Sequence, residues 1–214
     1  MSACYSCNQI LNKKTGSFEH IIPNSIGGVL KSARLICKTC NSAYGMTIDA
    51  ALAKNFEDLV AFINIERHRS RPVKDTNASN WGRYQLENGN DLFLRSVAKI
   101  AVNYYLMKIR GSHHLDKIIR IINGLEAIED HIYYHPLTEV IWNDKEVSHV
   151  IMIKGTASSG RLYAHVILFN THSLVINLCN NYNGDDIDLF YRYDVLRQEE
   201  VKNRMDYEPY RQLN

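Results

Sequence analysis

Residues 4–45 read CYSCNQILNKKTGSFEHIIPNSIGGVLKSARLICKTCNSAYG, and this stretch decides the fold of the N-terminal part of the chain. It holds two CxxC pairs, Cys4 with Cys7 and Cys37 with Cys40, each of which can close a tight knuckle. Four thiolates at this spacing are typical of a closed, tetrahedral zinc site. Zinc is favoured over free thiols because two CxxC pairs among 5 cysteines rarely arise by chance.

A glutamate and a histidine, Glu19 and His20, lie between the two cysteine pairs, and Asn41 directly follows the second pair. Carboxylate and amide oxygens suit Mg²⁺ or Mn²⁺ better than a soft metal. A neutral histidine can take a proton from water near neutral pH. A cation that polarises a phosphate oxygen and a base that activates water together form the minimum set for phosphodiester hydrolysis. A zinc ribbon that only binds a partner needs none of these three residues.

The same stretch resembles the zinc-containing HNH endonucleases, whose active site is the ββα-metal finger. Beside the cysteine pairs, the resemblance rests on EHIIP at residues 19–23, on Gly27-Gly28 and on the asparagine after the last cysteine. It implies that His20 is the general base and that Glu19 and Asn41 hold a catalytic Mg²⁺ or Mn²⁺. It also implies that the four cysteines hold a structural zinc ion.

Two motif positions depart from the family pattern. Many members carry histidine where this chain has Asn41. Members also brace the loop that carries the base with a central asparagine a few residues before the third cysteine, and here Ser32 or Arg34 occupies that neighbourhood. The candidates for the bracing contact are therefore Ser32, on one side of the loop, and Asn24, on the other.

Positive charge gathers in the N-terminal half of the chain. Residues 1–110 contain 15 Lys and Arg against 8 Asp and Glu, whereas residues 111–214 contain 10 against 15. A basic surface beside a metal site suits a polyanion, and DNA is the favoured polyanion, with RNA as the alternative. A basic face that only contacts solvent would have the same composition. The predicted phosphate contacts are Arg34, Lys38, Arg67, Arg69 and Arg71.

Composition and segment patterns exclude a membrane protein. The chain is 45% hydrophobic and has no run of 18 apolar residues, so no membrane partner is expected. The first residues lack a basic-then-apolar signal segment, and zinc-type cysteines fit a reducing compartment, so a cytoplasmic location is expected.

The apolar periodicity changes from helical to strand-like along the chain. Short strands are expected over 18–22 and 34–36, and helices over 41–66, 91–110 and 115–130, with Asp91 capping the second helix. Strands are expected over 138–142, 148–154, 161–169 and 174–178, followed by a charged, helical tail from Arg197.

These patterns predict an α+β protein in which a zinc-braced ββα-metal finger precedes a helical segment and an antiparallel sheet. Residues 1–71 are expected to form the nuclease module with its following helix, and 72–214 a second domain of unknown role that could bind a regulatory partner or a second copy. The predicted function is a metal-dependent endonuclease acting on DNA. The resemblance further suggests phage defence or a mobile element. The alternative is a non-catalytic zinc-ribbon protein that binds nucleic acid or regulates a partner.

Overall fold

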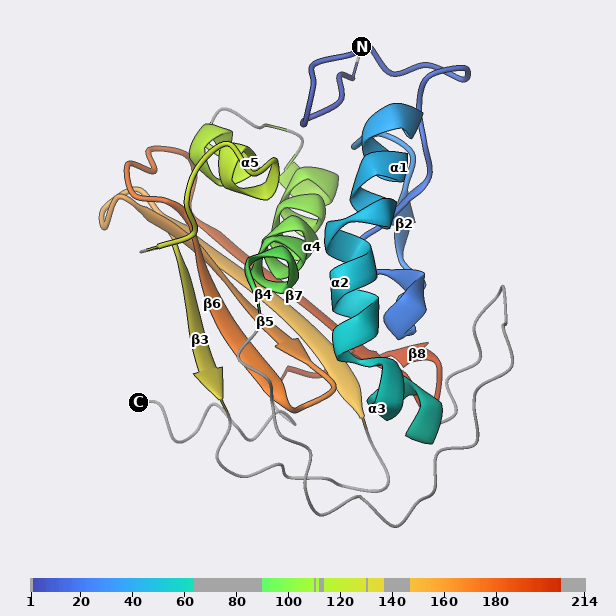
Figure 1. Cartoon of the computed structure of the whole chain (residues 1–214). Coiled ribbons are helices and arrows are strands. Elements are labelled where there is room, and N and C mark those ends of the chain that lie inside the picture. The colour runs from blue at the N-terminus through green and yellow to red at the C-terminus, as the bar shows by residue number, and fades with distance from the viewer. Residues whose placement is uncertain are drawn as a thin grey trace.

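The computed structural model describes residues 2–63, 90–109, 111, 114–129, 131–136 and 147–204 of the chain. Helices and an antiparallel sheet share the fold, which confirms the predicted α+β class (Figure 1). The N-terminal elements are β1 (Glu19–His20), η1 (Asn24–Ile26), β2 (Lys31–Ser32), α1 (Lys38–Met46), α2 (Ile48–Asn55) and α3 (Glu57–Phe62). The later elements are α4 (Asp91–Ile109), α5 (Asp116–Ile122), β3 (Ile132–Pro136), β4 (Ser148–Thr156), β5 (Arg161–Leu168), β6 (His172–Cys179), β7 (Ile187–Asp194) and β8 (Glu199–Glu200).

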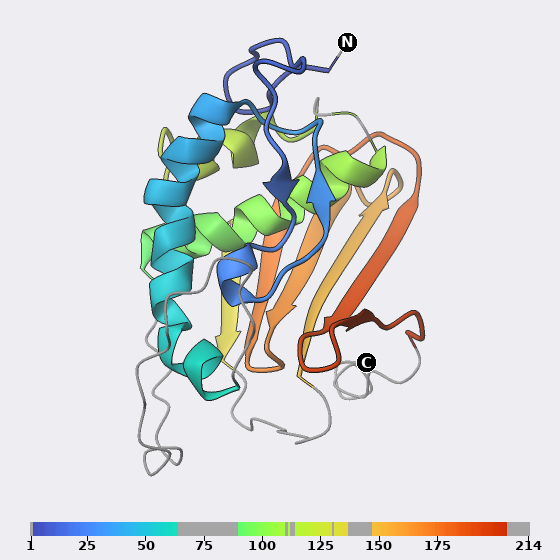
Figure 2. The same cartoon turned by 90° about the vertical axis from the view of Figure 1, so that its right-hand side faces the viewer.

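A six-stranded antiparallel sheet, in the order β3-β6-β5-β4-β7-β8, forms one side of the molecule. Helix α4 crosses one face of this sheet and contacts β4, β5 and β6, and α5 packs on β6. Figure 2 shows α4 between the sheet and the helices α1 and α2. Within the described residues, no helix has both the length and the apolar character that a membrane span requires.

Helix α4 is the centre of the molecule, because it is buried on nearly all sides between Phe93 and Leu106. Such a helix gains its stability from packing on two layers at once. Its N-cap is Asn90, whose Oδ1 accepts a hydrogen bond from the backbone N–H of Phe93 at 3.0 Å. The prediction of Asp91 as the cap is therefore wrong by one residue, and Asp91 instead lies in the first turn.

The predicted helix over 41–66 consists of three shorter helices, α1, α2 and α3, which meet at Thr47 and Phe56. The first of them begins at Lys38 rather than near Asn41, because Cys37 caps it and its sulfur accepts the Cys40 N–H at 3.4 Å. The apolar side chains that recur along this segment at three- and four-residue steps face the core, and Ile63 at its end is partly buried. The fully buried ones are Ile48, Leu52, Phe56 and Leu59.

The second strand of the N-terminal hairpin lies earlier than predicted, at β2, where Ser32 pairs with Glu19. Residues 34–36 do not extend this ladder. The carbonyl of Leu35 accepts a hydrogen bond from Tyr5 at 3.1 Å, and the carbonyl of Ile36 accepts one from Ser17 at 3.1 Å. The segment therefore ties the two cysteine knuckles together instead of pairing with β1.

Three predictions for the C-terminal half need correction. Helix α5 ends at Ile122 rather than at residue 130, because Gly124 adopts a positive φ of 75° just after it. No strand was predicted between residue 178 and Arg197, where the structure has β7. The tail that was expected to be helical from Arg197 contains β8 instead. The strand predicted over 138–142 lies outside the described residues.

Buried apolar residues from both predicted domains form one continuous cluster that extends from Cys4 to Val195. The boundary that was predicted after residue 71 falls in a part of the chain that the structure does not describe. The division into two domains therefore stays a prediction, although the described parts share a core.

A buried histidine of the sheet, His149, connects β4 to the loop that follows β1. Its Nδ1 accepts a hydrogen bond from the backbone N–H of Phe169 at 3.3 Å, so Nε2 carries the proton and donates to the carbonyl of Ile26 at 2.8 Å. Burial lowers the pKa of His149 to about 4, and burial also lowers the pKa of His172 to about 4. Both rings are therefore neutral in the folded protein at neutral pH.

We expect the free energy of unfolding to fall as the pH drops from 7 to 5, because the unfolded chain protonates these histidines below about pH 6.5 and the folded chain does not. Each histidine should contribute roughly 2 kcal/mol to this loss. Urea unfolding at the two pH values measures it. His149→Phe should remove about half of the pH-dependent difference attributed to the two rings, and an undiminished difference in this variant would contradict the assignment.

Candidate active site and zinc centre

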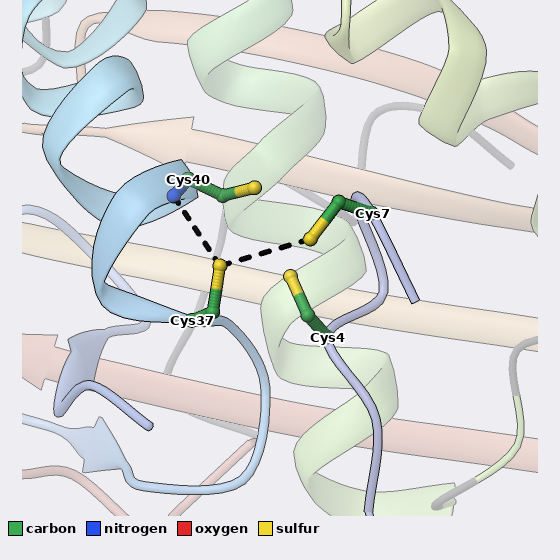
Figure 3. A group of neighbouring side chains, drawn as sticks. All are labelled: Cys4, Cys7, Cys37 and Cys40. Carbon is green, nitrogen blue, oxygen red and sulfur yellow. Dashed lines mark hydrogen bonds between the residues drawn. The ribbon is translucent and has the colours of Figure 1, made fainter. Parts of the chain in front are cut away.

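The four cysteines of the two CxxC pairs point toward one another (Figure 3), and their sulfur atoms all lie within 4.8 Å of one another. The sulfur atoms of Cys7 and Cys37 are 3.7 Å apart. This separation is far too long for a disulfide, whereas zinc–sulfur bonds of about 2.3 Å in a tetrahedron place two sulfurs about 3.8 Å apart. The donor set and its spacing therefore fit a structural zinc ion, and the predicted four-cysteine site is formed.

Cys40 lies in the first turn of α1, and Asn41 is the next residue on the same helix. The cysteine cluster therefore fixes the start of α1 and with it the position of Asn41. The amide nitrogen of Asn41 donates a hydrogen bond to the hydroxyl of Ser17 at 2.6 Å. This contact leaves Oδ1 as the remaining polar atom of the side chain, and an amide oxygen is a suitable ligand for a hard cation.

A cavity of about 260 Å³ brings the predicted catalytic residues together. Glu19, His20 and Asn41 all line it, and so does Asn24, one of the two predicted bracing residues. Neighbouring side chains of a strand point to opposite faces. Accordingly, Glu19 is buried on the inner side of β1, against α4, whereas His20 is partly exposed.

The carboxylate of Glu19 belongs to a buried group of charges that the sequence did not reveal. The ammonium of Lys99, on α4, lies 2.5 Å from Oε1 of Glu19 and 2.7 Å from Oδ2 of Asp49. The side chains of Lys99 and Glu19 are only 2% and 3% exposed. Charges this well buried require partners, because isolated ions lose their hydration at a large cost.

The group holds two carboxylates and one ammonium, so it carries a net negative charge when both carboxylates are ionised. Burial raises the pKa of Glu19, and the nearby charge of Lys99 opposes that rise. Lys99 and Asn103 both contact Oε1 of Glu19. The residual charge and the oxygens of Glu19 and Asn41 are features that a divalent cation in the cavity would satisfy.

The remaining predicted site residues lie elsewhere or outside the described chain. Ser32 and Arg34 line a second cavity of about 760 Å³, which Tyr5 and Leu106 also line. Lys38 is exposed at the start of α1. The predicted phosphate contacts at Arg67, Arg69 and Arg71 fall in the part of the chain that the structure leaves undescribed.

Sequence reasoning missed Asp49, Lys99 and Asn103, all of which approach Glu19 or its partners. A signal for the α4 residues was present. Ser96, Lys99 and Asn103 follow at three- and four-residue steps in a helix whose other central residues are apolar, and all three are buried. Such a polar stripe on a buried helix indicates a polar site on the neighbouring element.

The C-terminal half also contacts the zinc knuckle through Asn123, which follows α5. Oδ1 of Asn123 accepts hydrogen bonds from the hydroxyls of Ser6, at 2.9 Å, and Tyr44, at 2.5 Å. Ser6 lies between the first two cysteines, and Tyr44 lies on α1. The zinc centre is therefore stabilised by hydrogen bonds to the C-terminal half as well as by its own four sulfurs.

The sequence model of a protein family described as HNH endonuclease matches residues 4–57, about a quarter of the chain. This match confirms the predicted resemblance over the N-terminal part, and it covers the four cysteines, Glu19, His20, Asn41 and Asp49. It indicates a nuclease-type hydrolase whose substrate is nucleic acid. No curated protein and no solved structure matches the chain.

Proposed function

We propose that the protein is a metal-dependent endonuclease that cuts phosphodiester bonds, and that DNA is its favoured substrate. The observation that carries the proposal is the cavity that Glu19, His20 and Asn41 line together, next to the cysteine cluster that fixes Asn41. Each of these side chains supplies a group that hydrolysis needs, and the family match over residues 4–57 supports the same chemistry.

The imidazole of His20 would act as the general base and accept a proton from the attacking water. Glu19, through Oε2, and Asn41, through Oδ1, would hold Mg²⁺ or Mn²⁺. When bound, such a cation polarises a phosphate oxygen and stabilises the negative charge that develops in the transition state. Lys99 would keep the Glu19 carboxylate in place, since its ammonium contacts Oε1, and Oε2 would then be the oxygen that binds the cation.

The cysteine-bound zinc would have a separate, structural role. A Cys₄ site offers no open coordination position, so it holds the knuckles and the start of α1 rather than taking part in the reaction. Basic residues near the site, among them Lys38 and the arginines at 67, 69 and 71, are proposed to contact the phosphate backbone without reading sequence. The same proposal includes a role in phage defence or in a mobile element and action in the cytoplasm. It also includes control by a partner or by a second copy of the chain.

Cleavage assays with supercoiled plasmid, single-stranded DNA and RNA test this function. We expect cleavage in Mg²⁺ or Mn²⁺ and none when the divalent cation is omitted, a control that leaves the cysteine site intact. The substrate that is cut fastest identifies the nucleic-acid class. Binding of all three without cleavage under any metal condition would support the non-catalytic zinc-ribbon alternative instead.

A further inference from the structure

The amide group of Asn103, on α4, contacts both residues of the Glu-His pair. Its Nδ2 lies 3.2 Å from Oε1 of Glu19 and 3.3 Å from the backbone carbonyl oxygen of His20. Both neighbours are acceptors, so the amide must present its nitrogen to them, and its orientation follows from the contacts themselves. Asn103 is fully buried, and it therefore holds β1 from the interior.

This arrangement leaves the other polar atom of the side chain unsatisfied. Among the described residues, Oδ1 of Asn103 is buried and has no hydrogen-bond partner. An orphaned buried acceptor costs about 1–3 kcal/mol, a cost that leucine, with a similar shape, would avoid. Packing alone therefore does not favour asparagine at this position. The preference for asparagine must come from the two acceptors that its nitrogen contacts.

The two residues that sequence reasoning offered as braces make no such contact. Ser32 pairs with Glu19 through the backbone of β2, but its hydroxyl accepts a hydrogen bond from the N–H of Arg34 at 3.4 Å. Asn24 lines the cavity, yet its side chain makes no hydrogen bond to another described residue. Neither side chain holds the backbone of His20.

We propose that Asn103 is the positioning residue for the catalytic pair, taking the place of the asparagine that the motif lacks. Its amide fixes the backbone at His20 and one oxygen of Glu19, so that the base and the second carboxylate oxygen face one cavity. The proposal rests on the proposed nuclease function. It also gives the C-terminal half of the chain a role, because Asn103 lies outside the matched residues 4–57 and reaches the site on the central helix.

The test uses the full chain with Asn103→Leu, which removes the donated hydrogen bonds and keeps the size of the side chain. The matched control is Asn177→Ala, which removes an asparagine on β6 whose amide contacts Asn180 and touches neither Glu19 nor His20. We expect Asn103→Leu to bind zinc and to melt near the wild-type temperature, because losing the two donated hydrogen bonds is offset by removing the orphaned oxygen. Its kcat should fall roughly 10–100-fold with KM unchanged, the usual effect of losing a group that orients a ligand or base. Asn177→Ala should keep its kcat.

A second readout does not depend on activity. Hydrogen exchange of a peptide over residues 18–24 should be faster in Asn103→Leu than in the wild type, because the variant loses the hydrogen bond to the backbone carbonyl of His20. It should be unchanged in Asn177→Ala. Unchanged exchange and unchanged kcat in Asn103→Leu, together with an inactive His20→Ala, would overturn the proposal. Absence of cleavage by the wild type would overturn the nuclease function, while faster exchange would still support the contact of Asn103 with β1.

A folding defect would also give a clear outcome. If Asn103→Leu failed to fold, Asn103→Ala, which adds no bulk, is the second variant for both readouts. Loss of zinc and of cooperative melting in both variants would assign Asn103 to the fold alone and overturn its role in positioning the catalytic pair.

Discussion

Replacing His20 by alanine is expected to lower the rate of phosphodiester cleavage by roughly 10²–10⁴-fold, the usual contribution of a positioned general base. The variant should still bind nucleic acid, because the change removes only the group that accepts the proton of water. Glu19 and Asn41 would keep their places, since Lys99 and Asn103 contact the first and Ser17 contacts the second.

Single-turnover cleavage of plasmid by the wild type and by His20→Ala measures this effect. His165→Ala is a matched control, since His165 is a half-buried histidine on β5 whose Nε2 lies 2.6 Å from the hydroxyl of Ser173, away from the cavity. It should cut at the wild-type rate. Equal rates for wild type and His20→Ala would remove His20 from the role of base.

Replacing Cys37 by serine should have the largest effect on stability. Cys37 belongs to the zinc cluster and also caps α1, so the change removes a metal ligand and the acceptor for the N–H of Cys40. Structural zinc contributes about 10–16 kcal/mol in small zinc-binding modules, as much as the whole stability of a typical domain. We expect the variant to lose its zinc and the N-terminal elements to unfold.

Metal analysis by mass spectrometry and thermal melting followed by circular dichroism measure this loss. Cys179→Ser provides the control, because Cys179 is half-buried on β6 and does not belong to the cluster. It should keep one zinc per chain and the wild-type melting temperature. Full zinc content and unchanged melting in Cys37→Ser would show that the four cysteines do not form the structural site.

The sequence predicted which side chains would lie together where those residues are close in sequence. The cysteine pairs, Glu19, His20 and Asn41 lie within 38 residues, and knuckle spacing constrains a short segment to few geometries. The helix over 91–110 was predictable for a similar reason, since its long apolar periodicity leaves little choice.

The contacts that complete the site were not predictable, because they join residues that are far apart in sequence. Asn103 meets Glu19 across 84 positions, and Lys99 meets Asp49 across 50. A polar side chain on a buried helix indicates that a partner exists, but only the packing of α4 against α2 and β1 decides which residue that partner is. The return strand was misplaced for a related reason, since the backbone of Leu35 and Ile36 pairs with the first knuckle and with Ser17.

Anomalous diffraction from crystals grown with Mn²⁺ tests the central claim most directly. We expect one manganese peak in the cavity, within coordination distance of Oε2 of Glu19 and Oδ1 of Asn41. The ring of His20 should face the same space. A crystal in which manganese binds only outside this cavity, with Glu19 and Asn41 turned away from each other, would contradict this claim.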